Sequence, residues 1–542
     1  MLTGGTGQPK HVPDARIPNV NFLPPGPFQL SSPTFPYDSY AASPVHRFYQ
    51  MWQQLDCNVA AYATLRNPAG CRSDLFPWVE VTVGAGTNGK SQPSNFSNES
   101  TGEGSTSMGF YNVFQGDAPY LKYLADYYSM SDNYHQGVVG GTGANHIVLG
   151  TGDAIWFSDG KGNPAVPPHN ATVFSGTADA GTVDEIENPN AAPGINNWYA
   201  EDGYGGGGYG SPVYGGGSYT DCADATAPGV AAVLRYLRSL PYSVNPRCEQ
   251  GHYYLLNNYN PGYFGDGSDA STDQNVNNTP FTVPPSTLRN IGDELLERHI
   301  SWKYYGDQFN QYLSDKYQLH YGTVGALSDQ YCNICNFFQY STSIMANAAV
   351  RTAHLKDTTD LYADIQNGTL PAVSYVKPSG WVDGHPSSSK LDLFEGFVKK
   401  IVDMVQSKPT LWHETAIFIT FDEGGGYHDS GYVQPLDFFG DGTRIPLIVV
   451  SRYSEGGYIS HTYADHASVL KFIEANWYLS PLTNRSRDNF PNPIVDGDTC
   501  EGIERSISLT ACLKADMLCP WIEAPTRRIA RPVVVSTRRA RM

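Results

Sequence analysis

Hydrophobic and polar positions alternate along this chain at spacings that predict helices and strands in turn. Residues 390–407 carry apolar side chains three and four positions apart, which predicts an amphipathic helix. Residues 415–421 and 445–451 are continuous apolar runs bounded by turns. Such runs are typical of strands that are buried on both faces, as in a parallel sheet covered by helices.

The same pattern predicts further elements on either side of these runs. A short strand is expected at 372–376, directly before the amphipathic helix. Strands that alternate with helices indicate an α/β protein. The remaining helices are expected at residues 44–56, 117–128, 144–150, 230–239, 287–298, 340–354 and 464–477.

Other stretches carry no regular pattern. Residues 1–40 are rich in proline and are expected to form irregular coil. Residues 203–217 contain nine glycines and are expected to form a mobile loop. The tail from 525 to 542 has six arginines and no acid, and a disordered end or a frameshifted stretch is favoured over an anion-binding arm.

Composition excludes several classes of protein. The 542 residues include 35 Lys and Arg against 53 Asp and Glu, a net charge of −18, which argues against a nucleic-acid partner. No run approaches 18 apolar residues, so no transmembrane segment is predicted. The first residues lack an apolar stretch of the kind found in signal peptides, although the composition resembles that of an exported protein.

The nine cysteines indicate disulfides, and an odd number leaves one over. Neighbours in sequence suggest the pairs Cys57–Cys71 and Cys222–Cys248, although spacing alone does not fix connectivity. Cys332 and Cys335 form a CxxC motif. Because the chain has no second CxxC, a local disulfide or two buried thiols is favoured over a zinc site.

One candidate site follows the apolar run at 415–421. Asp422 and Glu423 come directly after it, and the glycines 424–426 follow them. In open α/β sheets, binding sites lie beyond the carboxyl ends of the strands. Two adjacent carboxylates there could bind a hard cation, whereas the alternative is a surface turn with two solvated acids.

A second candidate is Thr142, which stands between glycines at the start of the predicted helix 144–150. Backbone N–H groups at such a helix start favour a phosphate. A hydroxyl next to a metal loses its proton readily and becomes a nucleophile. The alternative is a threonine that only caps the helix.

Histidines form a third group. His385 lies in the segment 382–386, and His461 and His466 lie five positions apart before the helix expected at 464–477. Histidines near strand ends, with acids close by, suit phosphate contacts and protonation of a leaving group. Because five positions separate His461 from His466, we expect the two to diverge and one of them only to pack or cap.

Taken together, four segments resemble the bacterial phosphoesterase family that contains non-haemolytic phospholipase C and related acid phosphatases, within the alkaline-phosphatase-like superfamily. They are residues 131–146, 370–398, 415–429 and 440–477, of which the last, with RIPLIVVS, HTY and DHASVLKFIE, is the most specific. The resemblance runs from about residue 26 to 490. It is weakest over 155–285, which is interpreted as a loop-rich insertion.

The resemblance implies a three-layer α/β/α sandwich with a mostly parallel central sheet, in a catalytic domain spanning 1–500, followed by a tail at 501–542. It implies metal-dependent phosphoester hydrolysis, of the phosphatase or phospholipase C type, in a periplasmic or secreted protein. The metal would be Mg, Ca or Mn, with Asp422, Glu423 and Thr142 as ligands. Thr142 would be the nucleophile, within about 6 Å of a carboxylate. His385 and His461 would be catalytic. The residues that would bind a phosphoester or phospholipid substrate are Asn145, His135 and His46. The role of His428 stays open, because the residues after the glycines differ from the commonest family pattern.

The chain also departs from the family pattern. Members begin with a buried strand that ends in an ENxSFD-like segment, whose Glu and Asn complete the metal site, and this chain shows nothing like it. We therefore expect a weakly held ion, little activity and poor stability, with neighbouring strands left unpaired. The alternative function is an impaired member that keeps the fold and acts as a binding protein. A Ser-His-Asp hydrolase is not favoured, because no GxSxG elbow occurs with matching partners.

Overall fold

The structure is a computed structural model that places most of the catalytic region predicted from the sequence. It describes residues 27–31, 41, 43–44, 46–82, 107–168, 171–173, 181–183, 185–187, 189, 217–273, 282–321, 325, 327–386, 389–489 and 531–535. The predictions for 1–26, for most of the glycine-rich stretch at 203–217, and for Cys500, Cys512 and Cys519 lie outside the described residues.

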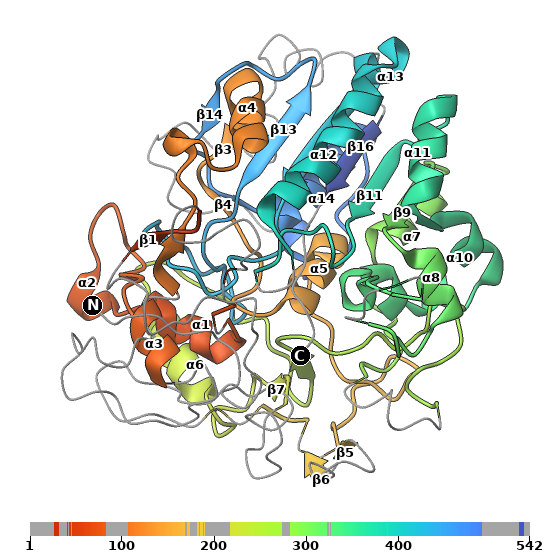
Figure 1. Ribbon diagram of the computed structural model, residues 1–542. Coiled ribbons are helices and arrows are strands. Elements are labelled where there is room, and N and C mark those ends of the chain that lie inside the picture. The colour runs from red at the N-terminus through yellow and green to blue at the C-terminus, as the bar shows by residue number, and fades with distance from the viewer. Residues whose placement is uncertain are drawn as a thin grey trace.

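An eight-stranded sheet runs through the centre of the molecule (Figure 1). Its first five strands in spatial order are all parallel to one another. The sixth is antiparallel to the strands on both sides, and the last two are parallel to each other. The order is β10 (Leu355–Asp357), β9 (Trp302–Gly306), β11 (Val373–Lys377), β16 (Arg531–Val535), β12 (Thr415–Thr420), β13 (Leu447–Ser451), β3 (Ser129–Ser131) and β14 (Ile459–Ser460).

Helices cover both faces of this sheet. Successive side chains of a strand point to opposite faces, and in β12 Phe418 joins one apolar cluster while Ile417 joins another. The first cluster includes residues of α5 (Thr142–Thr151), α7 (Ile291–Glu297) and α14 (His466–Trp477). The second includes residues of α4 (Pro119–Tyr127), α11 (Thr358–Asn367) and α12 (Leu391–Gln406), which crosses in front of the sheet in Figure 1.

The α/β class and the strands at both apolar runs are confirmed, since every residue of β12 and β13 is buried. The parallel direction expected for 445–451 is wrong, because β13 is antiparallel to β12 and to β3. The reason lies in the connection: residues 421–446 form no helix, so the chain turns back beside β12 without a crossover.

The prediction that the C-terminal tail is a disordered end or a frameshifted stretch is also wrong over residues 531–535. These residues form β16, which lies between β11 and β12 and is parallel to both. The run Val533, Val534 and Val535 is β-branched, as strands favour. Neither β11 nor β12 is therefore left with the unpaired edge that was expected on this side.

A second group of elements lies beside the sheet, at the lower left of Figure 1. It packs around its own apolar cluster, which includes Trp52, Val233 and Phe438. The cluster takes residues from α1 (Phe48–Leu55), α2 (Val59–Tyr62), α6 (Val230–Ser239) and β8 (Tyr253–Leu255). Beside these elements, α3 (Phe76–Thr82) contacts α1, and β7 (Tyr219–Asp221) pairs with β8.

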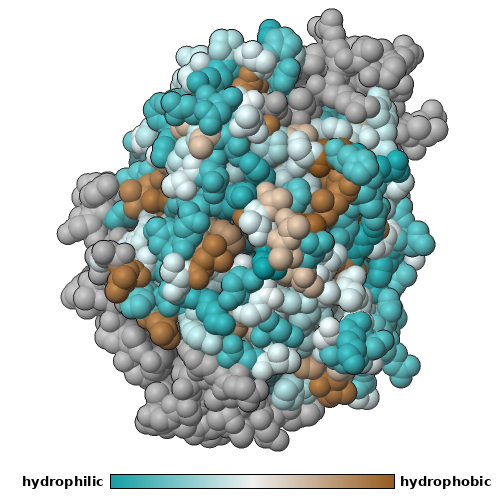
Figure 2. All heavy atoms as spheres, turned by 90° about the vertical axis from the view of Figure 1, so that its right-hand side faces the viewer, coloured by the Kyte–Doolittle hydropathy of each residue, from teal (hydrophilic) through white to brown (hydrophobic). Residues whose placement is uncertain are grey.

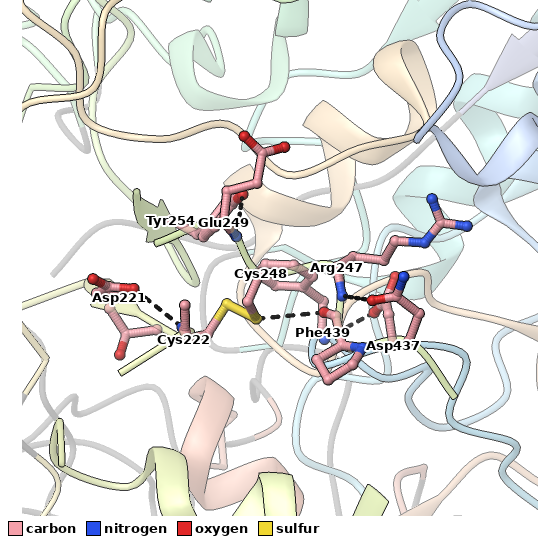
Figure 3. Close-up of a disulfide and its surroundings, with 12 residues drawn as sticks. Asp221, Cys222, Arg247, Cys248, Glu249, Tyr254, Asp437 and Phe439 are labelled. Carbon is pink, nitrogen blue, oxygen red and sulfur yellow. Dashed lines mark hydrogen bonds between the residues drawn. A yellow bond between two sulfur atoms is a disulfide. The ribbon is translucent and has the colours of Figure 1, made fainter. Parts of the chain in front are cut away.

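Three disulfides are present among the described residues, and two of them join segments of this second group. Cys57–Cys71 and Cys222–Cys248 are formed as the sequence suggested, and Figure 3 shows the latter beside Arg247 and Glu249. Cys332–Cys335 forms a local disulfide, so the CxxC motif is not a pair of free thiols. Both of its cysteines are buried.

Most predicted helices are present, with ends that shift by a few residues. The helix expected at 340–354 is instead divided, because Asn347 accepts hydrogen bonds from the N–H groups of Ala349 and Val350 and starts a new helix. The divided helix consists of η6 (Phe337–Tyr340), α9 (Thr342–Met345) and α10 (Ala348–His354). The other elements are β1 (Phe28–Gln29), β2 (Gly109–Phe110), η4 (Val113–Gln115), β4 (Tyr134–His135), β5 (Ala171–Val173), β6 (Gly181–Val183), α8 (Phe309–Ser314), η5 (Asn333–Cys335), α13 (Pro409–Glu414), β15 (Ala464–Asp465) and η7 (Arg487–Asn489).

The surface in Figure 2 is mainly hydrophilic, with hydrophobic side chains in separate small groups. Among the helices that the structure describes, none has both the length and the apolar character needed to cross a membrane.

Candidate active site

Thr142 and Glu423 meet at the carboxyl edge of the sheet. Thr142 is the first residue of α5 and not its cap, which is Gly141. Its hydroxyl donates to Glu423 Oε1 across 3.0 Å. The expected proximity of Thr142 to a carboxylate is therefore confirmed. The threonine is fully buried, and Glu423 is 8% exposed.

The two carboxylates follow β12 after one residue, Phe421, and are held in a buried environment. Burial raises the pKa of Asp422 well above its usual range, and the neighbouring charge of Glu423 raises it further. The positive charge of Lys377, at the end of β11, opposes both effects. Two adjacent buried acids are unfavourable unless a cation or a proton accompanies them, so the surface-turn alternative does not describe this pair.

Two histidines approach these acids from different helices. His46, directly before α1, lies with Nε2 3.3 Å from Glu423 Oε1, while its Nδ1 contacts Pro44 O at 2.5 Å. A carbonyl oxygen accepts only, so Nδ1 carries the proton. His146, one turn into α5, lies with Nδ1 3.8 Å from Asp422 Oδ2.

Lys377 and Asp383 form a buried ion pair next to the acids. Their charged atoms are 3.7 Å apart, and the two side chains are 2% and 0% exposed. Asp383 also accepts a hydrogen bond from the backbone N–H of His385, through Oδ1. His385 is buried in the loop that follows β11, where its N–H contacts Asp383. Its catalytic role stays a prediction.

The glycine turn before Thr142 is held together by Asn145. The amide nitrogen of Asn145 donates to the carbonyls of Val138, Gly140 and Gly141, and its oxygen accepts from Val138 N–H. Asn145 is fully buried. Its side chain in this structure stabilises the turn, and substrate binding by Asn145 stays a prediction.

The N–H groups at the start of α5 do not have the role expected of them. Gly143 N–H donates to Asn258 Oδ1 at 2.7 Å, and Ala144 N–H donates to Asn257 O at 3.1 Å. These donors were expected to face a phosphate. They are instead satisfied within the protein, because the chain after β8 packs directly against this helix end.

His135 and His466 both make contacts within the protein, and substrate binding by His135 stays a prediction. Burial lowers the pKa of each imidazole to about 4. His466 accepts from Gly137 N–H and donates to Phe421 O, so it joins the turn before Thr142 to the end of β12. His135 contacts Gly442 O and stacks on Tyr463 with ring centres 4.3 Å apart. Of the pair His461 and His466, the second is therefore the one that packs.

His461 lies outside this cluster. Its side chain is 77% exposed, and its Nδ1 pairs with Asp132 Oδ2 at 2.8 Å. It makes no hydrogen bond to Thr142 or Glu423 in the described structure, and its catalytic role stays a prediction. His428 contacts Phe76 edge to face, with ring centres 5.6 Å apart.

Comparison with known proteins identifies the family. The sequence profile of the Phosphoesterase family matches residues 26–480. This chain belongs to the Phosphoesterase family. Thr142, Glu423, Asp422 and His46, which the fold brings together, all lie inside the matched region.

Individual known proteins match over shorter segments. Non-hemolytic phospholipase C of Burkholderia pseudomallei is 25% identical over 283 residues, which cover 45% of this chain and 38% of that protein. Phospholipase C B of Mycobacterium tuberculosis is 27% identical over 219 residues, covering 35% and 39%. Phosphate-repressible acid phosphatase of Penicillium chrysogenum is 24% identical over 209 residues, covering 38% and 46%. The chain spans less than half the length of each of these relatives.

The resemblance to the Phosphoesterase family did not reveal Gln136, which joins the two loops of the site. Its Oε1 accepts from Gly424 N–H and from the Thr443 hydroxyl, and its Nε2 donates to Val138 O. It is fully buried. A lone glutamine in a loop gives no sequence signal, and only the fold shows that it fixes the turn after Glu423.

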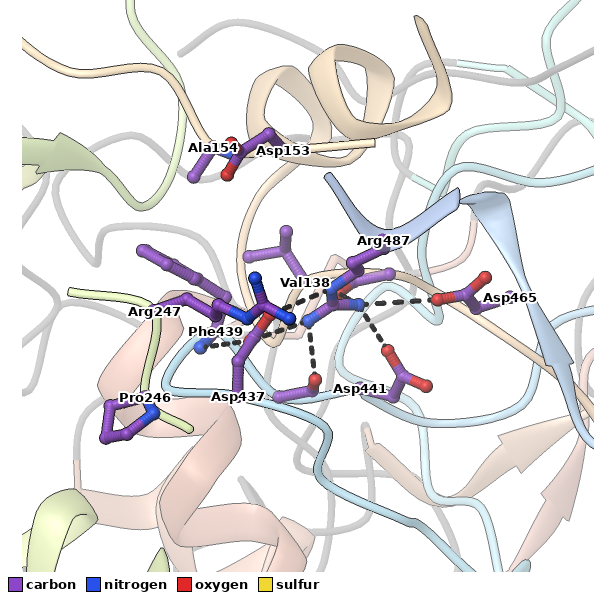
Figure 4. A network of polar contacts seen from close by, with 12 residues as sticks. Val138, Asp153, Ala154, Pro246, Arg247, Asp437, Phe439, Asp441, Asp465 and Arg487 are labelled. Carbon is purple, nitrogen blue, oxygen red and sulfur yellow. Dashed lines mark hydrogen bonds and ion pairs between the residues drawn. The ribbon is translucent and has the colours of Figure 1, made fainter. Parts of the chain in front are cut away.

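Arg487 was missed for the same reason. Its guanidinium lies among three acids, Asp437, Asp441 and Asp465, at 2.7, 2.5 and 3.4 Å (Figure 4). It also donates to the carbonyls of Gly137 and Gly440. This network anchors the start of α14 and the loops at 137 and 437–441 behind the site.

Oxygen donors suited to a divalent cation lie together at Thr142, Asp422 and Glu423, and hard cations prefer such ligands. Within the described ranges, however, no group of three or more His, Cys, Asp and Glu has a metal-binding arrangement. The threonine hydroxyl and two carboxylates fit part of a coordination shell. Water or substrate oxygens would have to supply the rest.

Proposed function

We propose that this chain is a metal-dependent phosphoester hydrolase in which Thr142 is the nucleophile. The observation that carries the proposal is the hydrogen bond from Thr142 Oγ1 to Glu423 Oε1, next to a second buried carboxylate. A nucleophilic hydroxyl needs a proton acceptor within about 2.6–3.2 Å. The observed 3.0 Å contact meets that requirement.

In the proposed reaction, Thr142 Oγ1 bonds to phosphorus while the bond from phosphorus to the leaving oxygen breaks. The hydroxyl proton passes to Glu423, which already accepts it in a hydrogen bond. Water then attacks the phosphorylated threonine and passes one proton to the histidine that protonated the leaving group, while Glu423 returns its proton to the Thr142 oxygen. The product is phosphate from a monoester or a phosphomonoester from a phospholipid. His385 is assigned to protonate the leaving group, and His461 is the second candidate for that proton transfer.

A bound Mg, Ca or Mn ion would supply positive charge to the phosphoryl oxygens and to the Thr142 oxygen. Thr142, Asp422 and Glu423 would hold it. The raised pKa of Asp422 agrees with this assignment, because burial and the charge of Glu423 make the ion-free pair unfavourable.

The substrate class follows the relatives, which are phospholipases C and an acid phosphatase. We propose a phosphomonoester or a phospholipid as substrate. We also assign the sheet with helices on both faces to the three-layer, alkaline-phosphatase-like architecture. Three disulfides favour an oxidising compartment, so a periplasmic or secreted location is proposed.

The test uses the purified full chain with 4-nitrophenyl phosphate and with phosphatidylcholine vesicles, before and after EDTA and after each metal is restored. Turnover that requires a divalent ion is expected on at least one substrate. Acid quenching during turnover should trap phosphate on Thr142, detected by mass spectrometry, and Thr142→Ala should lose both turnover and the adduct. Wild-type turnover by Thr142→Ala would remove the assignment of the nucleophile. A folded chain that binds phosphate without turnover would support the binding-protein alternative.

A further inference from the structure

The segment after β8 packs unusually close to the turn that carries Thr142. A side-chain carbon at Gly140 would lie 2.1 Å from Leu256 O, and one at Gly141 would lie 2.7 Å from Asn258 Oδ1. The Leu256 oxygen belongs to the backbone, so glycine is required at position 140, whereas a side chain at position 141 would displace the Asn258 amide. Residues 256–258 therefore form a wall of the candidate site, although they belong to the region interpreted from sequence as a variable insertion.

The orientation of the Asn258 amide is fixed by its neighbour. Gly143 N–H is a donor and lies 2.7 Å from the amide, so the oxygen and not the nitrogen must face it. The amide nitrogen, Nδ2, is therefore the other terminal atom of this side chain. Nδ2 makes no hydrogen bond to the residues that the structure describes. It lies 3.2 Å from the position that a Cβ atom at residue 141 would take.

Asn258 also differs from its neighbours in exposure. Thr142, Asp422, Glu423 and Asn257 are buried, whereas Asn258 is half-buried. Its amide therefore lies where the buried site approaches the accessible surface. A ligand that reaches Thr142 from that side would pass Asn258.

Several other donors in this turn are already engaged within the protein. The Asn145 amide donates to three carbonyls, and the N–H groups of Gly143 and Ala144 donate to the Asn257–Asn258 segment. A phosphoryl group bound at Thr142 carries negative oxygens that need donors, and a neutral amide provides one without repelling a metal ion. The Thr142 N–H, Asn257 Nδ2 and Asn258 Nδ2 make no hydrogen bond to the described residues. Of the two side-chain donors, only Asn258 Nδ2 belongs to a half-buried residue.

We propose that Asn258 binds a phosphoryl oxygen of the substrate through Nδ2 while its Oδ1 caps α5 through Gly143. One amide thereby positions the nucleophile and binds the group that the nucleophile attacks. The proposal rests on the proposed function, because it takes Thr142 as the site of phosphoryl transfer.

The test compares Asn258→Asp with Asn258→Ala and with the control Asn367→Asp, a variant of an exposed residue at the end of α11. Asn258→Asp keeps the oxygen that caps Gly143 but replaces the donor with a negative acceptor. Its thermal unfolding should match that of the wild type. Its dissociation constant for inorganic phosphate, measured by calorimetry with the activating metal present, should rise about tenfold or more.

Asn258→Ala loses the cap as well, so its unfolding temperature should fall and its phosphate affinity should weaken by a similar factor. Asn367→Asp adds the same charge and should change neither. Wild-type phosphate affinity in both Asn258 variants would overturn the assignment even if the enzyme hydrolyses phosphoesters. A wild-type chain that binds phosphate without turnover would contradict the proposed function alone, whereas one that does not bind phosphate would contradict both.

Discussion

Thr142 and Glu423 lie 281 positions apart in the chain, yet the threonine hydroxyl donates to the glutamate carboxylate across 3.0 Å in a buried site. The contact joins the start of α5 to the loop after β12, and it stands beside Asp422, whose pKa is raised by burial and by Glu423 itself. The site thus contains two adjacent buried carboxylates, Asp422 and Glu423, whose negative charges are unfavourable together unless a cation is bound.

Glu423→Gln should raise the stability of the ion-free protein and lower its activity. The amide keeps an oxygen that can accept from Thr142 but removes one of two adjacent buried charges. Unfolding in denaturant with EDTA present should become harder by about 0.5–2 kcal/mol, whereas kcat/KM for 4-nitrophenyl phosphate should fall about 100-fold or more. Glu455→Gln, in an exposed turn, is the control and should alter neither quantity. Lower stability in EDTA would contradict repulsion between the two carboxylates, and retained activity would contradict the role of Glu423 in the reaction.

Gln136→Met should loosen the turn after Glu423. The substitution leaves Gly424 N–H, the Thr443 hydroxyl and Val138 O without their glutamine partner inside the protein. A loss of about 2–4 kcal/mol in the free energy of unfolding is expected, together with reduced kcat. Gln406→Met, which removes a half-buried bond to Tyr128 on the far side of the sheet, is the matched control. Equal losses of kcat in both variants would contradict a role for Gln136 in the site.

Glu474 should make the protein more stable in acid than in base. Burial, followed by the neighbouring Asp488, raises the pKa of Glu474 from 4.5 to about 9 in the folded state. The folded chain keeps this proton where the unfolded chain has lost it, so the contribution is complete below pH 4.5 and declines as pH rises towards 9. The decline is at most about 1.4 kcal/mol per pH unit.

The measurement is the unfolding midpoint of wild type and Glu474→Gln between pH 5 and 8. Glutamine imitates the protonated acid and can still donate to Asp488, so the variant should lose less stability with rising pH. Because other buried acids titrate equally in both proteins, the difference between the two curves isolates Glu474. Parallel curves would mean that Glu474 is ionised in the fold.

Val533→Pro should destabilise the centre of the sheet. Residue 533 pairs with Ser374 in β11 and Ile417 in β12, and proline removes a backbone donor from this ladder. The expected loss is about 3 kcal/mol or more. Val533→Ile keeps the N–H and should stay close to wild type. Hydrogen exchange should speed up in 373–377 and 415–420, and unchanged protection there would mean that β16 does not contribute to the sheet in solution.

Local sequence determined which segments are buried and what form they take. The apolar run at 415–421 required a strand covered on both faces, and the spacing in 390–407 required a helix with one apolar side. Motif and resemblance together placed Thr142, Asp422 and Glu423 in one site, because each follows or precedes a regular element at a glycine-rich turn. Two of the disulfide pairs also followed from nearness in sequence.

Tertiary structure decided which segments are partners. The apolar run at 445–451 is equally suited to either strand direction, and its antiparallel pairing follows from the connection that precedes it. The sequence of residues 531–535 does not indicate that this strand lies between β11 and β12. Asn258 and Gly143 are 115 positions apart, and nothing near either predicts that one caps the other. Hydrophobic burial and local hydrogen bonding are encoded residue by residue, whereas the choice of a distant partner depends on the packing of the whole chain.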